Sequence, residues 1–266
     1  MIYFPDKIYD DKGYRSTFWN SNIKNYIELS TYGFATGGSG LGGSSCFLLS
    51  LLAALRNHKS CKLIPEELAS LACEIEINRL SKPIGRQDQY AAAHGGVNSI
   101  SFTSEGVEVS PLGLSSEVIS RLESEFTLVF TGLTRSASSV LSESPEDESD
   151  RIQRLRAIRM QADEARIMLE GGKLSELGEL LESAWQAKRG ITSGVSSQEI
   201  DDLHDRLMQL GASGAKLLGA GGGGFFLVHG DVDLRTKIQN ELGGSNRIIP
   251  LGVDFEGSTI IHNGGE

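Results

Sequence analysis

Residues 27–58 read IELSTYGFATGGSGLGGSSCFLLSLLAALRNH and decide the fold class. The segment from Ile27 to Phe34 alternates apolar and polar residues, as a strand does, and it runs directly into a glycine-rich loop. The segment after Ser44 and Ser45 is apolar on nearly every face, which predicts a buried helix that either serine can cap. A strand, a glycine loop and a helix N-terminus form a place where unpaired N–H groups and the helix dipole attract an anion.

This loop has other interpretations, and its context removes two of them. Gly38, Gly40 and Gly43 fit the spacing G-x-G-x-x-G, but the following region, HKSCKLIPEEL, leads into another helix and not into a strand that ends in an acidic residue. A nicotinamide or flavin site is therefore excluded. The sequence also lacks the pattern G-x-x-x-x-G-K-[ST] of ordinary nucleotide P-loops. A tight turn with an ordinary serine cap stays open as the structural alternative.

A second glycine loop lies in KLLGAGGGGFF, residues 216–226, and leads into a strand. Its four consecutive glycines at 221–224 lose conformational entropy when they become ordered, and a turn between strands needs only one or two of them. We infer that a ligand or a close backbone crossing requires the rest.

The remaining pattern predicts an α+β chain. Apolar residues recur at helical spacing after Pro65, in a long helix that ends at Gly171 and Gly172, and in a further helix that carries Leu174, Leu177, Leu181 and Trp185. Pro65 suits the first turn of its helix, and Gly95 and Gly96 are expected to end a short alanine-rich helix. From residue 97 onward a hairpin, a strand at 126–130 and the order helix, strand, strand, helix, strand favour an antiparallel sheet in the second half.

Composition limits the functions that are open to the chain. It has 266 residues with 25 basic and 35 acidic side chains, so its formal charge of −10 disfavours binding to nucleic acid or to an anionic membrane. The three cysteines, Cys46, Cys61 and Cys73, show no metal-ligand spacing and are interpreted as reduced core thiols. With no apolar run of transmembrane length and no signal segment, the sequence predicts a cytoplasmic protein.

Several segments together resemble the GHMP kinases, a family of ATP-dependent small-molecule kinases. GSGLGGSS resembles the second signature of this family and KLLGAGGGGFF resembles the third. PIGRQDQYAAAHGG, FTGLTRSAS and the Trp-Gln-Ala-Lys run are similar to the sugar kinases of the D-glycero-D-manno-heptose 7-phosphate kinase type. The resemblance extends from about Ile27 to the C-terminus.

The resemblance implies phosphoryl transfer from ATP to the anomeric hydroxyl of a sugar, with a heptose 7-phosphate as the expected substrate. Asp88, in GRQDQ, would be the general base or orienting carboxylate, although by itself an aspartate there is equally suited to cap a helix. Ser44 and Glu76 would bind Mg²⁺, and Glu76 stands twelve residues before Asp88. The residues expected to hold the nucleotide phosphates are Gly38, Ser39, Gly40, Leu41, Gly42, Gly43, Ser44 and Ser45.

The same resemblance implies a substrate side of the site. The loop with Gly219, Gly221, Gly222 and Gly223 would close over the substrate and the phosphates. Arg135 is the candidate for gripping a substrate phosphate, because a guanidinium presents a forked donor. On residue type alone, a solvated arginine in a loop is the alternative.

Two departures from the family pattern affect the expected activity. The basic, glycine-containing first motif on the opening strands is missing, and Gly43 replaces the first serine of the second motif. A truncated chain, a degenerate member and a chain completed by a separate N-terminal polypeptide are all consistent with this. Missing strands would leave a sheet edge uncovered, which favours self-association or such a partner.

The sequence thus predicts a GHMP-kinase-like two-domain α+β fold. Residues 1–111 would form an incomplete N-terminal α/β sandwich that carries the phosphate loop and Asp88, and residues 112–266 a C-terminal ferredoxin-like domain. The expected function is a MgATP-dependent heptose 7-phosphate kinase. A kinase for galactose or fucose and a non-catalytic remnant that binds nucleotide or sugar weakly are the alternatives.

Overall fold

The computed structural model describes residues 14–18, 27–31, 39–61, 63–134, 148–189, 194–243 and 248–261. The first described elements are an antiparallel hairpin of β1 (Tyr14–Phe18) and β2 (Ile27–Thr31). The strand expected from Ile27 is therefore confirmed as far as Thr31, and the rest of that segment lies outside the described residues.

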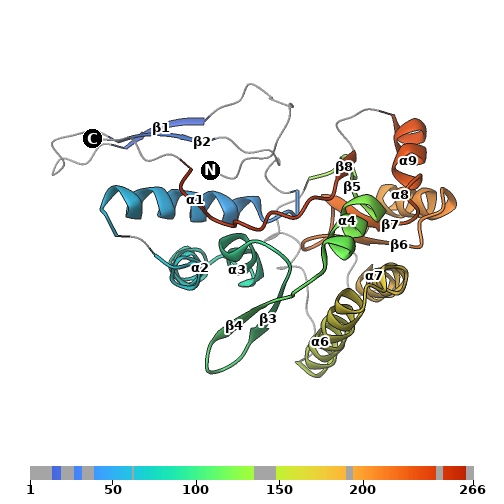
Figure 1. Ribbon diagram of the computed structural model, residues 1–266, viewed down its shortest axis with the longest axis horizontal. Helices are drawn as coiled ribbons and strands as arrows, with labels where there is room; N and C mark the ends of the chain where they lie inside the picture. The colour runs from blue at the N-terminus through green and yellow to red at the C-terminus, as the bar shows by residue number, and fades with distance from the viewer. Residues whose placement is uncertain are drawn as a thin grey trace.

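Three helices and one helical turn of a different type follow the first glycine loop and pack together (Figure 1). They are α1 (Gly43–His58), α2 (Pro65–Cys73), the π-helix η1 (Glu74–Arg79) and α3 (Gln87–His94). Pro65 opens α2 as expected, and the Glu67 carboxylate accepts the backbone N–H of Ile64 at 3.2 Å. The core between the helices consists of Leu49, Leu68, Ala69, Ala72, Cys73, Tyr90 and Ala93.

The expected hairpin after Gly96 is confirmed as β3 (Asn98–Phe102) and β4 (Val107–Pro111), paired antiparallel with Ile100 opposite Val109. It leads to a helix that the sequence reading omitted, α4 (Ser116–Glu125). Ser115 caps this helix, because its hydroxyl accepts the backbone N–H of Val118 at 3.2 Å. α4 feeds directly into β5 (Phe126–Phe130), the strand expected at 126–130.

The second half is built on a four-stranded antiparallel sheet in the order β6-β7-β5-β8. Besides β5, its strands are β6 (Gly214–Leu217), β7 (Phe225–His229) and β8 (Ile248–Pro250). Helices lie between β5 and β6 and between β7 and β8, so the chain follows the order β-α-β-β-α-β. This arrangement confirms the expected ferredoxin-like architecture of the second half.

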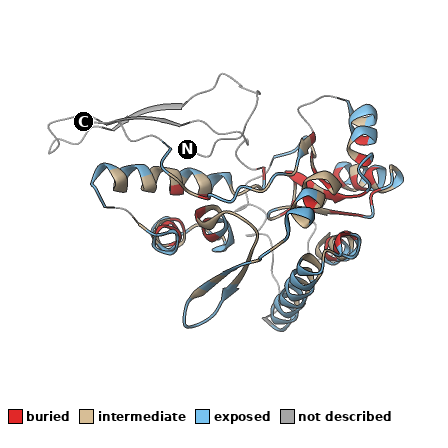
Figure 2. Ribbon diagram, in the orientation of Figure 1, coloured by how far each residue is buried: buried red, intermediate tan, exposed pale blue. Residues whose placement is uncertain are grey.

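The helices of this half are α6 (Glu148–Glu170), α7 (Leu174–Arg189), α8 (Gln198–Gln209) and α9 (Leu234–Leu242). Figure 2 shows that buried residues concentrate on this sheet and on the helices packed against it. Trp185 is fully buried on α7 and packs edge-on against Phe226 of β7, with ring centroids 5.5 Å apart. The sheet is therefore the rigid support from which the second glycine loop, between β6 and β7, projects.

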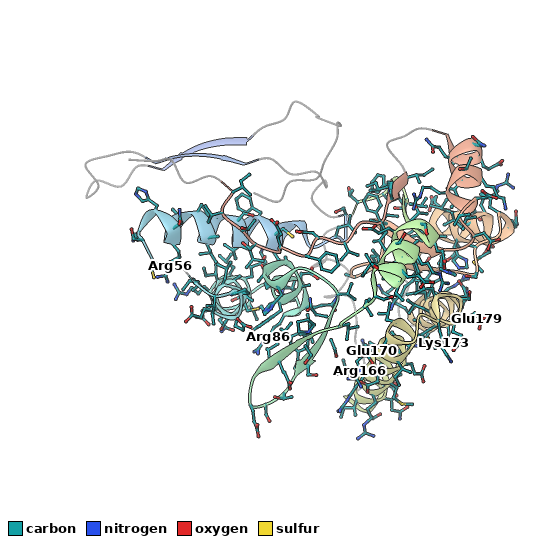
Figure 3. All side chains as sticks on the ribbon, viewed as in Figure 1. Arg56, Arg86, Arg166, Glu170, Lys173 and Glu179 are labelled. Carbon is teal, nitrogen blue, oxygen red and sulfur yellow. The ribbon has the colours of Figure 1, made fainter. Side chains whose placement is uncertain are left out.

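Two expectations about burial are wrong. The helix after Ser44 and Ser45 was expected to be buried, but in α1 only Ser45 and Leu49 are buried and Phe47 is exposed, because the core shared with α2 and α3 lies on one side of the helix. In α6, the apolar residues Ile152, Leu155 and Ile158 are exposed, because only the C-terminal part of this helix packs against the core. Charged residues such as Arg166 and Glu170 also project from this helix (Figure 3). The cysteines are free, as expected, but Cys61 is exposed and is not a core thiol.

The C-terminal segment crosses back to the first half. The N–H of Gly96 donates to the carbonyl of Asp254, and the N–H of Ser258 donates to the carbonyl of Ala93 at 3.2 Å. Residues 254–258 therefore pack against the end of α3. The expected division of the chain into two domains at residue 111 stays a prediction. Among the described residues, no helix has the length and apolar character needed to cross a membrane.

Candidate active site

Asp88 lies directly against the first glycine loop. Gly42 precedes α1 in the left-handed conformation, with φ of 68°. A Cβ atom added to Gly42 would stand 3.2 Å from Cγ and 3.3 Å from Oδ2 of Asp88. The side chain of Asp88 does not cap α3, because the N-cap of this helix is Arg86 and no side chain caps it. The alternative role of Asp88 as a helix cap is thus excluded, and its carboxylate faces the N-terminus of α1.

The two glycine loops pack against each other. Gly219 has φ of 67°, and a Cβ atom there would stand 2.8 Å from Cα of Gly40. A Cβ atom on Gly40 would in turn stand 3.1 Å from the carbonyl oxygen of Leu218. A Cβ atom on Gly224 would collide with the backbone of Ser39. Only glycine permits this approach, so the second loop supports the first from behind.

Gly221 and Gly223 lie where other backbone segments pass close to the second glycine loop. The N–H of Gly222 donates to the carbonyl of Val195 at 2.8 Å, and Cβ atoms at Gly221 and Gly223 would collide with the backbones of Val195 and Leu133. Close backbone crossings therefore account for these glycines. Arg135 and Gly38, both expected at the site, lie outside the described residues.

The hydroxyls of Ser44 and Ser45 bind a buried carboxylate, and neither caps α1. Both donate to Glu76 at 2.9 Å, Ser44 to Oε1 and Ser45 to Oε2. Gln89 donates to Oε2 of the same carboxylate at 2.7 Å. Gly42, and not a serine, is the N-cap residue of α1. The capping role expected for the serines is wrong because a buried acceptor from η1 captures both hydroxyls.

Lys82 completes this cluster. Its ammonium donates to Oγ of Ser44 and to Oε1 of Glu76, in each case at 2.9 Å. The side chain of Glu76 is 1% exposed and that of Lys82 is 39% exposed. One carboxylate thus collects four donors from α1, α3 and the loop after η1, and this network fixes the three segments relative to one another.

The environment shifts the pKa values of Glu76 and Asp88 in opposite directions. Burial opposes ionisation of Glu76, but the hydrogen bonds from Lys82, Gln89, Ser45 and Ser44 outweigh it and lower its pKa. Desolvation by the surrounding protein, followed by the negative charge of Glu76, raises the pKa of Asp88. A firmly ionised carboxylate suits cation binding and a more basic one suits proton acceptance.

Two lysines that the sequence reading left without a role lie beside the second glycine loop. Lys188 of α7 donates to the carbonyl of Gly219 at 2.6 Å and to that of Leu217 at 3.2 Å. Burial and the neighbouring positive charge of Lys216 lower the pKa of Lys188 to about 8. Burial also lowers the pKa of Lys216. Lys188 therefore tethers the loop that packs against the first glycine loop.

The cluster around Glu76 fits a divalent cation. Among the described residues there is no group of three or more histidine, cysteine, aspartate or glutamate side chains that could hold a metal by itself. Mg²⁺ does not require three such side chains, because it binds through one or two protein oxygens and takes its other ligands from phosphates and water. Ser44 and Glu76 offer such oxygens, and a cationic group, the ammonium of Lys82, already lies between them.

Sequence reasoning missed Lys82 and Gln89, and it left Lys188 and Lys216 without a role because a lysine in a loop or at a helix end is usually solvated. Gln89 adjoins Asp88 inside a segment that had been singled out, so its position was the available signal. Lys82 carries no such signal, because its contact with Glu76 depends on the path of the loop after η1.

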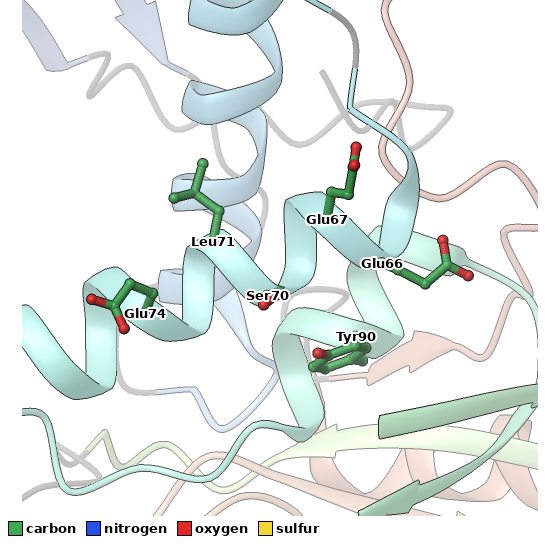
Figure 4. Close-up of a pocket in the computed structure, with 6 residues that line it drawn as sticks. All are labelled: Glu66, Glu67, Ser70, Leu71, Glu74 and Tyr90. Atoms are coloured by element: carbon green, nitrogen blue, oxygen red, sulfur yellow. The ribbon is translucent and has the colours of Figure 1, made fainter. Parts of the chain in front are cut away.

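A separate depression lies over α2 and α3, lined by Glu66, Glu67, Ser70, Leu71, Glu74 and Tyr90 (Figure 4). Its three carboxylates would repel phosphate groups, and it includes none of the residues of the Glu76 cluster. We assign it no part in the site.

Two family models match the chain. The model described as "GHMP kinases N terminal domain" matches residues 14–96, and the model described as "GHMP kinases C terminal" matches residues 164–243. Together they cover more than half of the chain. The first match contains the first glycine loop, Glu76 and Asp88, and the second contains Lys188 and the second glycine loop.

Individual proteins are also similar in sequence to this chain. D-glycero-alpha-D-manno-heptose 7-phosphate kinase of Campylobacter jejuni is 33% identical over 218 residues, which are 79% of this chain and 64% of that protein. The bifunctional fucokinase/GDP-fucose pyrophosphorylase of Arabidopsis thaliana is 30% identical over 212 residues, 76% of this chain and 20% of that protein.

A solved structure shares the fold. The D-glycero-D-manno-heptose 1-phosphate kinase of Bacteroides thetaiotaomicron aligns with a TM-score of 0.67 at 27% identity, over 86% of this chain and 65% of that one. The chain therefore spans about two thirds of the length of its heptose kinase relatives.

Proposed function

This chain belongs to the GHMP kinase family, and we propose that it transfers the γ-phosphoryl group of MgATP to the anomeric hydroxyl of a heptose 7-phosphate. The observation that carries the proposal is the contact of Asp88 with Gly42, which brings a carboxylate of raised pKa to the glycine loop at the start of α1. Identity to a heptose 7-phosphate kinase supports the choice of acceptor.

The proposed mechanism assigns the donor phosphates to the first loop. Backbone N–H groups of residues 39–45, together with the positive end of the α1 dipole, would hold the β- and γ-phosphates. The tight packing of Gly219 against Gly40 would keep this loop in one conformation without the phosphates present. Such preorganisation matters because phosphoryl transfer depends mostly on positioning and on charge stabilisation.

Asp88 would accept or orient the proton of the attacking hydroxyl. The raised pKa of its carboxyl makes it a better proton acceptor than an aspartate in water. Ser44 and Glu76 would hold Mg²⁺, which when bound neutralises charge on the transferred phosphate. Gln89, Ser45 and Ser44 keep the Glu76 carboxylate fixed, so it would need no rearrangement to serve as a ligand.

The lysine pair beside Gly219 is proposed to help bind the phosphate of the sugar. Lys188 and Lys216 are partly buried, and their positive charges lie close enough to depress the pKa of Lys188. Two desolvated like charges are stabilised by an anion between them. The catalyst would act in the cytoplasm, where ATP and sugar phosphates are available.

A kinase for a free sugar is the second candidate, and the similarity to a fucokinase favours it. The test is an ADP-release assay on this chain with MgATP and a panel that pairs each free sugar with its phosphate, namely heptose, fucose and galactose. Turnover confined to heptose 7-phosphate supports the proposal, and preference for free fucose or galactose supports the second candidate.

The same assay separates both kinases from a non-catalytic remnant. Asp88→Asn, checked for folding by circular dichroism, should lower turnover by about 10²–10⁴-fold. Absence of turnover by the unaltered chain with every sugar, together with no thermal stabilisation by MgATP, would contradict both kinase assignments.

A further inference from the structure

The ammonium of Lys82 lies where a cation that uses Ser44 and Glu76 would lie. It is 2.9 Å from Oγ of Ser44 and 2.9 Å from Oε1 of Glu76, the two oxygens that fit a divalent ion. Ser44 also donates to the same Oε1, so the three groups form one closed contact. An ammonium and a divalent cation cannot share these oxygens, because both are positive and would stand within a few ångströms of each other.

The backbone around Lys82 is shaped to bring it there. η1 ends with the N–H of Leu80 on the carbonyl of Ile75, and the N–H of Lys82 then donates to the carbonyl of Glu76 at 3.0 Å. Between them Ser81 adopts a left-handed conformation with φ of 51°, which costs energy for a residue other than glycine. This turn places the side chain of residue 82 over the carboxylate six residues earlier.

Lys82 differs from the other donors to Glu76 in its freedom to leave. Its side chain is 39% exposed, whereas Ser45 and Gln89 are buried in the helix packing. Displacing its ammonium leaves Glu76 with three donors and leaves the core intact. We propose that Lys82 is a resident cation of the Glu76 site, which balances the buried carboxylate in the free protein and is displaced when a divalent metal ion binds.

This inference rests on the proposed metal role of Ser44 and Glu76. It predicts that Lys82 weakens metal binding, because each binding event must break the two contacts of the ammonium. Removing the charge should tighten binding roughly fivefold, since a charged hydrogen-bonded contact that is partly exposed has a modest net strength. If Lys82 only held Glu76 in position for the metal, removing its charge would weaken metal binding.

The test measures Mn²⁺ binding directly, by electron paramagnetic resonance of the free ion, without nucleotide and with ADP. The full chain is compared with Lys82→Met, and Lys82→Gln serves as a second variant if the methionine does not fold. Lys237→Met removes the same charge from an exposed position on α9 and is the matched control. Adding Glu76→Gln to Lys82→Met should cancel the gain.

Tighter Mn²⁺ binding by the Lys82 variants, with the control unchanged, is the expected result. Equal or weaker binding by these variants overturns the proposal, and so does a lack of binding by every protein. The readout does not involve a sugar. A chain that turns over no sugar but shows the gain would refute the kinase assignment alone, whereas an active chain without the gain would refute the role of Lys82 alone.

Discussion

The carboxylate of Asp88 lies beside Gly42 at the start of α1, where a methyl group on Gly42 would stand 3.3 Å from Oδ2 of Asp88. Gly42 is the N-cap residue of α1 and Asp88 lies in the first turn of α3. The N-termini of two helices therefore meet at this contact. Whatever binds at the glycine loop lies beside a carboxylate whose pKa is raised by desolvation and by Glu76.

The first prediction concerns this contact. Gly42→Ala should lower the free energy of unfolding by about 1–2 kcal/mol, because φ of 68° is unfavourable for alanine. It should also lower turnover at least tenfold, since the new methyl group pushes Asp88 aside. Urea unfolding followed by circular dichroism and the ADP-release assay measure the two effects.

Gly43→Ala is the matched control for stability. Gly43 is helical, and a Cβ atom there would have nothing within 4 Å. Alanine should therefore stabilise the helix by about 0.5–1 kcal/mol. Equal stability of the two variants would show that the contact between Gly42 and Asp88 places no steric demand on residue 42.

The second prediction concerns the protonation of Asp88. A base must be deprotonated to act, so turnover should fall as pH falls through the pKa of Asp88. Because that pKa is raised, the fall should begin above the range of an ordinary aspartate. Asp88→Asn should lower kcat by about 10²–10⁴-fold, as expected for loss of a positioned proton acceptor. A pH profile of kcat for the unaltered chain is the measurement.

A circular dichroism spectrum and a melting temperature identical to those of the parent are the control for Asp88→Asn. A folded Asp88→Asn protein with unchanged kcat would remove Asp88 from the catalytic machinery.

The third prediction concerns Glu76. Its pKa is lowered in the folded protein, so as pH falls the unfolded chain takes up a proton before the native protein does. The stabilising contribution of Glu76 is present above the unfolded pKa and is lost as pH falls through the folded one. Glu76→Gln should remove this contribution and cost about 1–3 kcal/mol at neutral pH, because a buried acceptor of four donors is replaced.

Denaturant unfolding of parent and variant at neutral pH and at decreasing pH measures both effects. Glu179→Gln makes the same change on the exposed side of α7 and is the control (Figure 3). A gap between parent and Glu76→Gln that stays constant on acidification would contradict the lowered pKa.

The sequence predicted the glycine loops because their signals are local. Left-handed glycines depend on a few neighbouring residues, and the strands and helices of the second half follow their hydrophobic periods. The prediction that Ser44 or Ser45 caps the helix was wrong for the opposite reason. A serine before an apolar helix usually caps it, and only the tertiary fold brings the Glu76 carboxylate within 2.9 Å. The catalytic role of Asp88 follows only from the resemblance to the GHMP kinases and stays a prediction.

Burial was harder to predict than secondary structure. The apolar period of α6 correctly gave a helix, but Ile152 is 44% exposed, because period alone does not say how far a partner element extends. The change from α2 to the π-helix η1 also left no sequence signal. Yet η1 supplies Glu76 and the turn that carries Lys82, so the least predictable segment holds the centre of the site.

The last prediction concerns Lys188, whose pKa is lowered from 10.5 to about 8 by burial and by Lys216. Between these pH values the folded protein has lost the proton that the unfolded chain still holds, so the free energy of unfolding should rise with pH across this window. The Lys188→Met variant has no ammonium at this position, so its free energy of unfolding lacks this increase with pH. The stability of the parent relative to Lys188→Met should therefore increase from about pH 8 to pH 10.5. Urea unfolding across that pH range measures this difference in the free energy of unfolding. Lys237→Met is the control for loss of one exposed charge. If the difference between the parent and Lys188→Met stays constant or falls with pH, Lys188 is not desolvated at the glycine loop.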